Sequence, residues 1–421
     1  MSAIRGLTTR GRCLLAAGFA AAICALLLGE KDLLRVAILL LVLPMASVAV
    51  VARARFRLSC VRSITPERIG VGQTTEVRLR LENVSLLTTS LLLLEDELPF
   101  SLGSRPRFTA ERLAPRQHRV VRYPVRSDVR GRFRVGPLRL RLTDPFGLVE
   151  LTRSFSAVDR LTVVPATTPL PVVRIGGVWA TGGAVTSRSV ASRGEDDAAT
   201  REYRHGDDLR KVHWRSTARV GKLMVRREEQ PWQARASLLL DTRAVAHRGD
   251  GPSSSFEWAV SAAASIGVHL IRRGFALQML TDAGMLDAGL SSADILLDHL
   301  ADIRPSRVRA LDDATDAIRK AERDGTLIAV LGNTNADQAR VLTSARPSVS
   351  SNIVILLDST SWLTLGSEAR TRIDAANREA TTVFAQAGWH VIQAGRGSSL
   401  AEVWSQVGAT SFAAPVVAGA R

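Results

Sequence analysis

The chain has 421 residues, of which 46% are hydrophobic, and a formal net charge of +16. This length is typical of two or three domains, and the apolar content excludes a disordered chain. The positive charge is concentrated near the N-terminus: residues 1–57 carry 8 basic and 2 acidic side chains, residues 58–175 carry 19 and 11, and residues 176–421 carry 29 and 27. Because Cys13, Cys24 and Cys60 are the only cysteines, the rest of the chain has no disulfide framework and no cysteine-based metal site or nucleophile.

Two apolar runs lie within residues 1–57. Cys13–Leu28 contains 16 residues and no charge, and Leu33–Ala52 contains 20 residues with only Arg35 charged. A membrane span needs about 20 apolar residues, so we expect a transmembrane helical hairpin. The alternative for the first run is a secretory signal peptide, after which the second run would still anchor the chain. Positive charges flank the hairpin on both sides and place the soluble part in the cytoplasm, at the inner (plasma) membrane: Arg5, Arg10, Arg12, Arg53, Arg55 and Arg57.

Residues 58–175 alternate between apolar and polar side chains. Val77, Leu79 and Leu81 are separated by Arg78 and Arg80, which is the pattern of strands with one buried and one solvated face. Several short strands of this kind, separated by Gly and Pro, predict a β-sandwich-like domain. The arginine-rich strand faces could bind nucleic acid, but solvated faces near anionic lipid are the simpler interpretation.

Residues 176–233 contain a Gly-, Ser- and Ala-rich connector followed by a motif dense in charged and aromatic residues, REYRHGDDLRKVHW at positions 201–214, which we call the dense motif. Residues 234–415 alternate between apolar strands and amphipathic helices. Apolar strands joined by helices predict a doubly wound, mainly parallel sheet covered on both faces. Asp241, Asp282 and Asp358 each follow a predicted strand, and ligands of such sheets bind at the carboxyl ends of the strands.

The common catalytic motifs are absent from the sequence. There is no Walker A motif, no dinucleotide-binding glycine motif, no G-x-S-x-G and no H-E-x-x-H. The two histidines of the dense motif, with Asp207 and Asp208, match no recurrent metal cage. We therefore expect neither an enzyme nor a protein with a bound cofactor.

The strand-end aspartates resemble the metal site of the von Willebrand factor A domain, which uses D-x-S-x-S after its first strand. The corresponding residues run from Asp241 to Val245, and Arg243 and Val245 replace both hydroxyl residues. Since Mg²⁺ requires hard oxygen ligands, the resemblance implies the fold without the metal, and Asp241 remains only a degenerate metal candidate.

The dense motif, R-x-Y-x-x-G-D-x-x-R-x-x-x-W, resembles the signature of the domain-of-unknown-function family numbered 58. Positions 130–148 resemble that family's second motif. The signature residues that we single out are Arg201, Tyr203, Gly206, Asp207, Asp208, Arg210, Trp214 and Arg215, and those of the second motif are Asp144, Pro145, Phe146 and Gly147. The resemblance implies a MoxR-type AAA+ ATPase as partner and, in some members, a transglutaminase-like membrane protein.

The composition of the signature favours docking over catalysis. Gly206 permits a tight turn, the carboxylates can pair with neighbouring arginines, and Tyr203 and Trp214 have the character of interface anchors. The alternative is that the motif only braces the adjoining domain. We expect a membrane-anchored adaptor, with a basic nucleic-acid- or lipid-binding protein and an unrecognised hydrolase or metalloenzyme as alternatives.

The expected topology is testable with reporter fusions. A reporter that is active only in the cytoplasm should be active when fused after Arg421, because the basic residues on both sides of the hairpin keep both ends inside. Activity of a periplasmic reporter at the same position would contradict this orientation.

Overall fold

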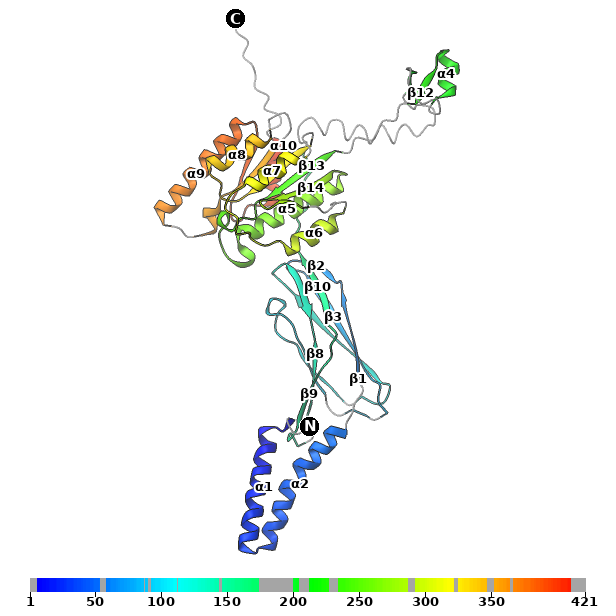
Figure 1. The fold of residues 1–421 in the computed structure, drawn as a ribbon, viewed down its shortest axis with the longest axis vertical. Coiled ribbons are helices and arrows are strands. Elements are labelled where there is room, and N and C mark those ends of the chain that lie inside the picture. Colours follow the sequence, from blue (N-terminus) through cyan, green and yellow to red (C-terminus); the bar gives the residue numbers. More distant parts are fainter. Residues whose placement is uncertain are drawn as a thin grey trace. The chain divides into compact units, whose positions relative to one another are not determined.

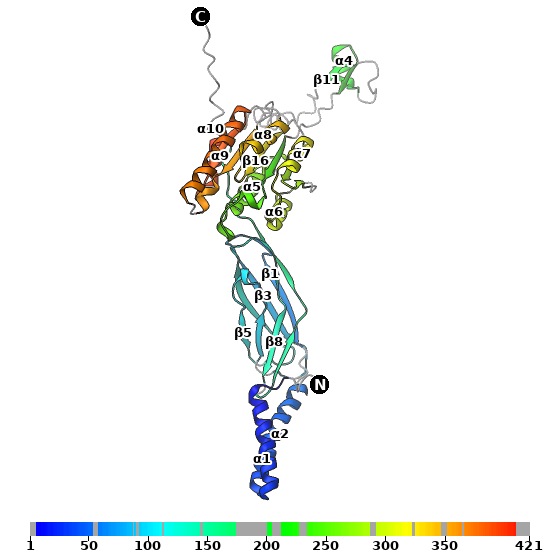
Figure 2. The same ribbon diagram turned by 60° about the vertical axis from the view of Figure 1, so that its left-hand side comes forward.

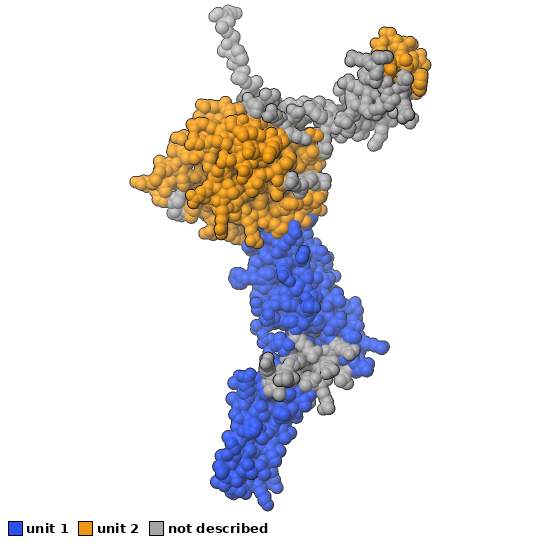
Figure 3. Space-filling view, viewed as in Figure 1, with its two compact units in different colours: residues 1–165 blue, residues 166–421 orange. Residues whose placement is uncertain are grey.

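The computed structural model of the protein describes residues 6–53, 58–86, 88–89, 92–111, 113–143, 146–173, 200–203, 212–226, 234–286, 292–321, 325–346, 352–363 and 366–409. The chain divides into two compact units, residues 1–165 and residues 166–421 (Figure 3). Each unit has an apolar core of its own.

The first unit begins with two helices that lie side by side, α1 (Thr9–Leu28) and α2 (Lys31–Arg53) (Figure 1). Gly29 ends α1 in the left-handed conformation, with a φ of 68°, which glycine adopts without steric cost. Both helices are long and apolar enough to cross a membrane. At their contact, a Cβ added at Gly18 would lie 2.9 Å from the Leu41 side chain, so a larger residue there would push the helices apart.

Three sheets follow the helices within the same unit. Their strand orders are β1–β3–β6, β2–β10–β7 and β5–β4–β8–β9. The strands are β1 (Leu58–Thr65), β2 (Arg68–Gly70), β3 (Thr74–Asn83), β4 (Leu92–Asp96), β5 (Arg107–Ala110), β6 (His118–Arg126), β7 (Gly131–Val135), β8 (Leu138–Thr143), β9 (Glu150–Ser154) and β10 (Asp159–Val164). Side chains from all three sheets meet in one core, among them Leu79, Leu140 and Leu161. The alternation expected from the sequence is therefore present on β3, where Val77, Leu79 and Leu81 are buried and Arg78 and Arg80 are exposed.

Two arginines of this unit, Arg62 and Arg130, are exceptions to that pattern, because their side chains are buried. Arg62 donates from Nε and Nη2 to the Asp96 carboxylate, at 3.2 and 2.6 Å, and from Nη1 to Asp159 at 2.9 Å. The Tyr123 hydroxyl donates to the same Asp96 carboxylate at 2.5 Å. Burial, followed by the negative charge of Asp96, raises the pKa of Tyr123. The network links β1, β4, β6 and β10 across the core.

The second unit contains a six-stranded sheet with the order β15–β14–β13–β16–β17–β18. All neighbours pair in parallel except the short edge strand β15, which is antiparallel to β14. The strands are β13 (Arg235–Leu240), β14 (Ala276–Thr281), β15 (Gly284–Met285), β16 (Thr326–Leu331), β17 (Asn352–Leu357) and β18 (His390–Ala394). This is a doubly wound order, in which the chain starts at the centre and winds outward in both directions.

Helices cover both faces of this sheet (Figure 2). Leu238 and Leu240 of β13 pack into the core formed with α5, α6 and α10, whereas Leu239 packs into the core formed with α7, α8 and α9. The helices are α5 (Ser255–Arg272), α6 (Ala293–Asp302), α7 (Asp312–Lys320), α8 (Ala336–Ala345), α9 (Ser367–Gln386) and α10 (Leu400–Ala409). The expectation of two apolar helices followed by sheet-rich regions, one of them mainly parallel, is confirmed; α6 and β15 were not expected.

A substitution in the buried Arg62 network should destabilise the first unit. Arg62→Met leaves the Asp96 carboxylate buried without its cation, which commonly costs about 3–5 kcal/mol. Arg126→Met is a matched control, because Arg126 pairs with Asp128 on the surface at 3.2 Å and exposed pairs contribute about 0–1 kcal/mol. Denaturant unfolding of the full-length protein in detergent measures both. Equal unfolding midpoints for the two variants would contradict the assigned role of Arg62.

Candidate functional site

Three aspartates lie at the carboxyl ends of the parallel strands in the second unit. Asp241 directly follows β13, Asp282 follows β14 and Asp358 follows β17. Their surroundings differ. Asp241 and Asp282 are fully buried, whereas Asp358 accepts hydrogen bonds from the amide and hydroxyl of Thr360 within its own loop. The structure therefore brings the first two into one polar cluster, which we call the carboxyl-edge cluster: Asp241, Thr242, Arg243, Asp282 and Ser306.

At the centre of this cluster, the guanidinium of Arg243 lies on the carboxylate of Asp241. Nε donates to Oδ1 at 2.9 Å and Nη2 donates to Oδ2 at 2.8 Å, which makes the pair bidentate. The side chain of Arg243 is only 1% exposed. Its Nη1 donates to the carbonyl of Arg309 at 3.2 Å, and the Gly332 amide donates to Asp241 at 3.2 Å. Arginine suits this position because its planar fork matches a carboxylate and cannot lose its proton.

Asp282 holds a second loop to the same edge. It accepts hydrogen bonds from the amide of Thr242, at 2.7 Å, and from the hydroxyls of Thr242 and Ser306. The backbones of these loops also bond, from the Ser306 amide to the Thr242 carbonyl and from the Ala244 amide to the Ser306 carbonyl. Ser306 was not expected at this edge of the sheet, because nothing in its local sequence distinguishes it from other loop serines.

The chemistry available to the carboxyl-edge cluster is limited by this pairing. Both oxygens of Asp241 accept hydrogen bonds from Arg243, and the guanidinium occupies the space beside the carboxylate. The positive guanidinium of Arg243 would repel a divalent cation placed at the Asp241 carboxylate, so the cation would have to displace Arg243 in order to bind Asp241. Among the described residues, no group of three or more His, Cys, Asp or Glu side chains could hold a metal ion.

His247 lies behind Asp241 and was not recognised from the sequence. Its Nε2 is 2.8 Å from the Asp241 carbonyl and its Nδ1 is 3.3 Å from the Ser255 hydroxyl. Burial lowers the pKa of His247, the charge of Asp241 opposes this shift, and that of Arg243 adds to it. A neutral imidazole can donate from one nitrogen and accept at the other, so His247 joins the carboxyl-edge cluster to the start of α5.

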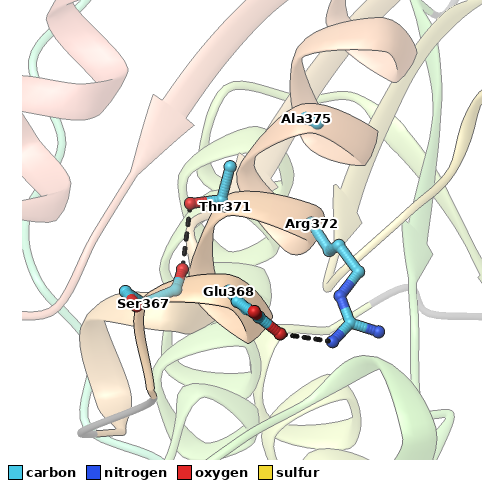
Figure 4. A pocket seen from close by; sticks show the side chains of 5 residues that line it. All are labelled: Ser367, Glu368, Thr371, Arg372 and Ala375. Atoms are coloured by element: carbon cyan, nitrogen blue, oxygen red, sulfur yellow. Dashed lines mark hydrogen bonds and ion pairs between the residues drawn. The ribbon is translucent and has the colours of Figure 1, made fainter.

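A surface depression lies elsewhere on this unit, along the first turns of α9 (Figure 4). Ser367, Glu368, Thr371, Arg372 and Ala375 line it. Arg372 and Glu368 form an ion pair at 3.7 Å, and their side chains are 79% and 91% exposed. Such a pair is solvated and weak, so the depression has no buried polar group that could serve as a catalytic site.

The signature motif forms a small structural unit of its own within its described residues. β11 (Thr200–Glu202) pairs with β12 (Met224–Arg226) in antiparallel fashion, and α4 (Trp214–Val220) precedes β12. Val212 is buried and bridges to Val225. We call Thr200–Tyr203 and Val212–Arg226 the signature unit.

Within the signature unit, α4 is fixed and its first residue is exposed. The His213 side chain caps the helix by accepting from the Ser216 amide at 3.3 Å. The Met224 amide donates to the Thr217 hydroxyl at 3.0 Å, which ties α4 to β12. Trp214 is nevertheless 71% exposed, which is unusual for so large an apolar side chain.

The structure places the other signature residues differently. Tyr203 is half-buried, and its amide donates to the Leu223 carbonyl at 2.8 Å. Arg201 lies on β11, opposite Val225, and Arg215 is exposed on α4. The remaining signature residues lie outside the described residues: Gly206, Asp207, Asp208 and Arg210.

The second motif attaches the helices to the β-rich part of the first unit. Gly147 adopts a φ of 68°, and the following Leu148 and Val149 are buried against apolar residues of α1, α2 and the segment before α1. The Thr8 amide donates to the Leu148 carbonyl at 2.9 Å, and a Cβ at Gly11 would collide with that same carbonyl. Phe146 is exposed, and Asp144 and Pro145 lie outside the described residues.

Residues 199–349 match the family described as "Protein of unknown function DUF58". The match covers only this part of the chain, which is similar to the DUF58 family over these residues. The resemblance predicted from the signature motif is thereby confirmed. The matched range contains the signature unit and the carboxyl-edge cluster.

Solved structures resemble parts of the chain only weakly. The CARDB domain of a Pyrococcus furiosus protein matches 26% of this chain and 91% of its own length, with 16% identity and a TM-score of 0.19. The alkylpurine DNA glycosylase AlkC of Pseudomonas fluorescens matches 30% of this chain and 39% of its own, with 13% identity and a TM-score of 0.16. At these TM-scores neither similarity supports a functional argument. No curated protein matches the chain significantly.

The lowered pKa of His247 predicts a loss of stability in acid. Its pKa in the folded state lies below the unfolded value of about 6.5, so the unfolded chain takes up the proton first. The stability that neutral His247 contributes is complete above the unfolded pKa and is lost as the pH falls towards the folded one. When the pH is lowered from about 7.5 to 5.5, the melting temperature of His247→Gln should therefore fall by less than that of the parent protein.

His299→Gln is the control for this comparison, because His299 bonds only to the Ile295 carbonyl of its own helix among the described contacts. It should leave the acid-induced loss unchanged. The assignment fails if His247→Gln shows the parent's full pH dependence.

The Arg243–Asp241 pair predicts the response of the protein to metal. Millimolar Mg²⁺ should leave the melting temperature unchanged, because a metal that binds only the folded state must raise it by mass action and Arg243 occupies the carboxylate. Thermal melting with and without Mg²⁺ tests this. An upward shift that Asp241→Ala abolishes would restore Asp241 as a metal ligand.

Proposed function

We propose that the protein is a non-enzymatic adaptor in the inner (plasma) membrane, which docks a MoxR-type AAA+ ATPase on the cytoplasmic side and couples it to a client in the membrane or envelope. In this proposal the helices α1 and α2 are a transmembrane anchor, the sheets of the first unit are a β-sandwich-like stalk, and the sheet of the second unit is a von Willebrand A-like domain. A transglutaminase-like membrane protein is a further candidate partner.

The exposed Trp214 carries this proposal. Its side chain is 71% exposed on a helix whose N-terminus is capped and whose body is tied to β12. An exposed aromatic on a rigid support loses little conformational entropy on binding, which is the property of an interface hot spot. Arg215 and Arg219 are exposed on the same helix, and a polar rim around an apolar anchor is typical of docking surfaces.

The carboxyl-edge cluster supports a role without chemistry. Its one buried cation is already paired with its nearest carboxylate, and the pair is shielded from solvent. A catalytic group must reach a substrate or a metal, and Arg243 and Asp241 instead bond to each other and to the adjoining loops. The cluster therefore suits a rigid binding domain better than a hydrolase.

The proposal predicts a selective effect of Trp214→Ala. Loss of a hot-spot aromatic costs about 2 kcal/mol or more, which is roughly thirtyfold in affinity. Co-purification of the ATPase with the full-length protein in mild detergent should fall accordingly, while the melting temperature stays close to that of the parent. Asp207→Ala, at a signature residue outside the described residues, should also lower co-purification of the ATPase.

Val220→Ala is the matched control, because Val220 is exposed at the opposite end of the same helix. It should leave co-purification unchanged. If Trp214→Ala instead lowers the melting temperature by several degrees and retains the partner, the motif braces the protein and the docking role is wrong.

A further inference from the structure

The outer face of the sheet β2–β10–β7 in the first unit is lined with arginines. The opposite face packs into the core through residues such as Phe133, Leu161 and Ile69. Because side chains alternate along a strand, the residues between them point outward. Arg160 of β10 lies directly opposite Arg134 of β7, and Thr162 lies between Arg132 of β7 and Arg68 of β2. We call Arg68, Arg132, Arg134 and Arg160 the arginine face.

The pair Arg134–Arg160 conflicts with the usual rules of strand pairing. Like charges directly opposite each other destabilise a sheet. Both side chains are exposed, and among the described residues no carboxylate lies within ion-pair distance of either. Within the part of the chain that the structure describes, Arg134 and Arg160 are thus two adjacent positive charges with no carboxylate at ion-pair distance.

A second pair of opposed arginines in the same unit shows how the conflict is normally resolved. Arg78 of β3 lies opposite Arg122 of β6. Glu76 accompanies that pair, at 2.5 Å from Arg78 and 3.8 Å from Arg122. The hydrogen bond from Arg78 lowers the pKa of Glu76. Among the described residues, the opposed pair Arg78–Arg122 therefore has a neighbouring carboxylate, whereas the opposed pair Arg134–Arg160 has none.

Protection of a sheet edge does not account for the arginine face. Charged side chains on edge strands prevent unwanted pairing with other chains, and β7 and β2 are the edges of this sheet. Arg160, however, lies on β10, the central strand. A central-strand arginine opposite another arginine requires a different explanation.

A depression with apolar walls adjoins the arginine face. Arg134 lines it together with Arg105, and its other lining residues include Leu98, Pro99, Pro137 and Val158. Glu97 also lines the depression, but its carboxylate is paired with Arg139 at 2.6 Å. Phe100, directly after Pro99, is 98% exposed. Positive charge and apolar surface are thus combined in one place.

We propose that the arginine face binds an acidic, extended segment of a partner protein, whose carboxylates pair with Arg134 and Arg160 and whose apolar side chains contact the depression and Phe100. Guanidinium groups bind carboxylates in bidentate geometry, so the partner would supply the counter-charge that Arg134 and Arg160 lack among the described residues. Three strands span about 10 Å across the sheet, which is the width of an extended peptide and narrower than a nucleic-acid duplex.

The position of the arginine face within the first unit disfavours lipid as its ligand. β7 continues through Gly136 and Pro137 into β8, and the turn after β8 contacts the apolar helices. Arg134 precedes the end of β8 by nine residues, which corresponds to about 30 Å of extended chain. Electrostatic attraction to a membrane surface is screened within about 8 Å at physiological salt.

The test uses the full-length protein in nanodiscs of uncharged, zwitterionic lipid and a fluorescent peptide of Asp and Glu residues with one Leu and one Pro. Fluorescence anisotropy measures the affinity. The double reversal Arg134→Glu/Arg160→Glu should weaken binding by about tenfold or more. It keeps a like-charged pair across the strands, so a melting temperature close to the parent's is expected, and Arg134→Gln/Arg160→Gln repeats the measurement without reversed charge.

The matched control is Arg78→Glu/Arg122→Glu, which changes the net charge equally on the other sheet. It should alter the affinity by less than about twofold. Equal weakening by both double reversals, or none by either, overturns the proposal. Competition by a single-stranded oligonucleotide that exceeds competition by the unlabelled peptide would reassign the face to nucleic acid and likewise overturn it. These results do not depend on the ATPase, so they are separate from the proposed adaptor role.

Discussion

The buried pair of Arg243 and Asp241 is the constraint around which the second unit is organised. The carboxylate of Asp241, at the end of β13, is fully buried, and an unpaired buried charge is very costly. The Arg243 guanidinium neutralises it and, through Nη1, also holds the carbonyl of Arg309. The amide of Gly332 bonds to the same carboxylate. Three loops at the edge of the sheet are therefore oriented by one ion pair.

The first unit uses the same device with a different result. Arg62 crosses the core to Asp96 and Asp159, and Tyr123 completes the network. Here the pair joins sheets rather than loops. Most other arginines of this unit remain on strand surfaces, where their charges are available to solvent or to a partner. The high arginine content thus serves two physical purposes, internal cross-linking and surface charge, and burial distinguishes them.

The two family motifs also differ in whether their apolar side chains are buried or exposed. At the second motif, Leu148 and Val149 are buried against residues of the helices, and the Leu148 carbonyl accepts a hydrogen bond from the Thr8 amide. In the signature unit, by contrast, Trp214 is exposed on α4, which is capped by His213 and hydrogen-bonded to β12. Attachment of the helices and exposure of an aromatic side chain are the two properties on which the proposed docking role depends.

The sequence by itself determined the types of most elements: the two apolar helices, the alternating strands and the strand–helix alternation that ends at Ala409. These depend on hydrophobic periodicity and apolar content, which can be read from short stretches of sequence. It also placed Asp241 and Asp282 at strand ends and Arg243 beside a candidate metal ligand. The tertiary structure decided what these residues touch. Ser306 reaches Asp282 from another loop, His247 bonds both to Asp241 and to Ser255 at the start of α5, and Arg134 meets Arg160 only through strand register. The contacts of Ser306 and of Arg134 join residues that are distant in the chain, so no local pattern encodes them.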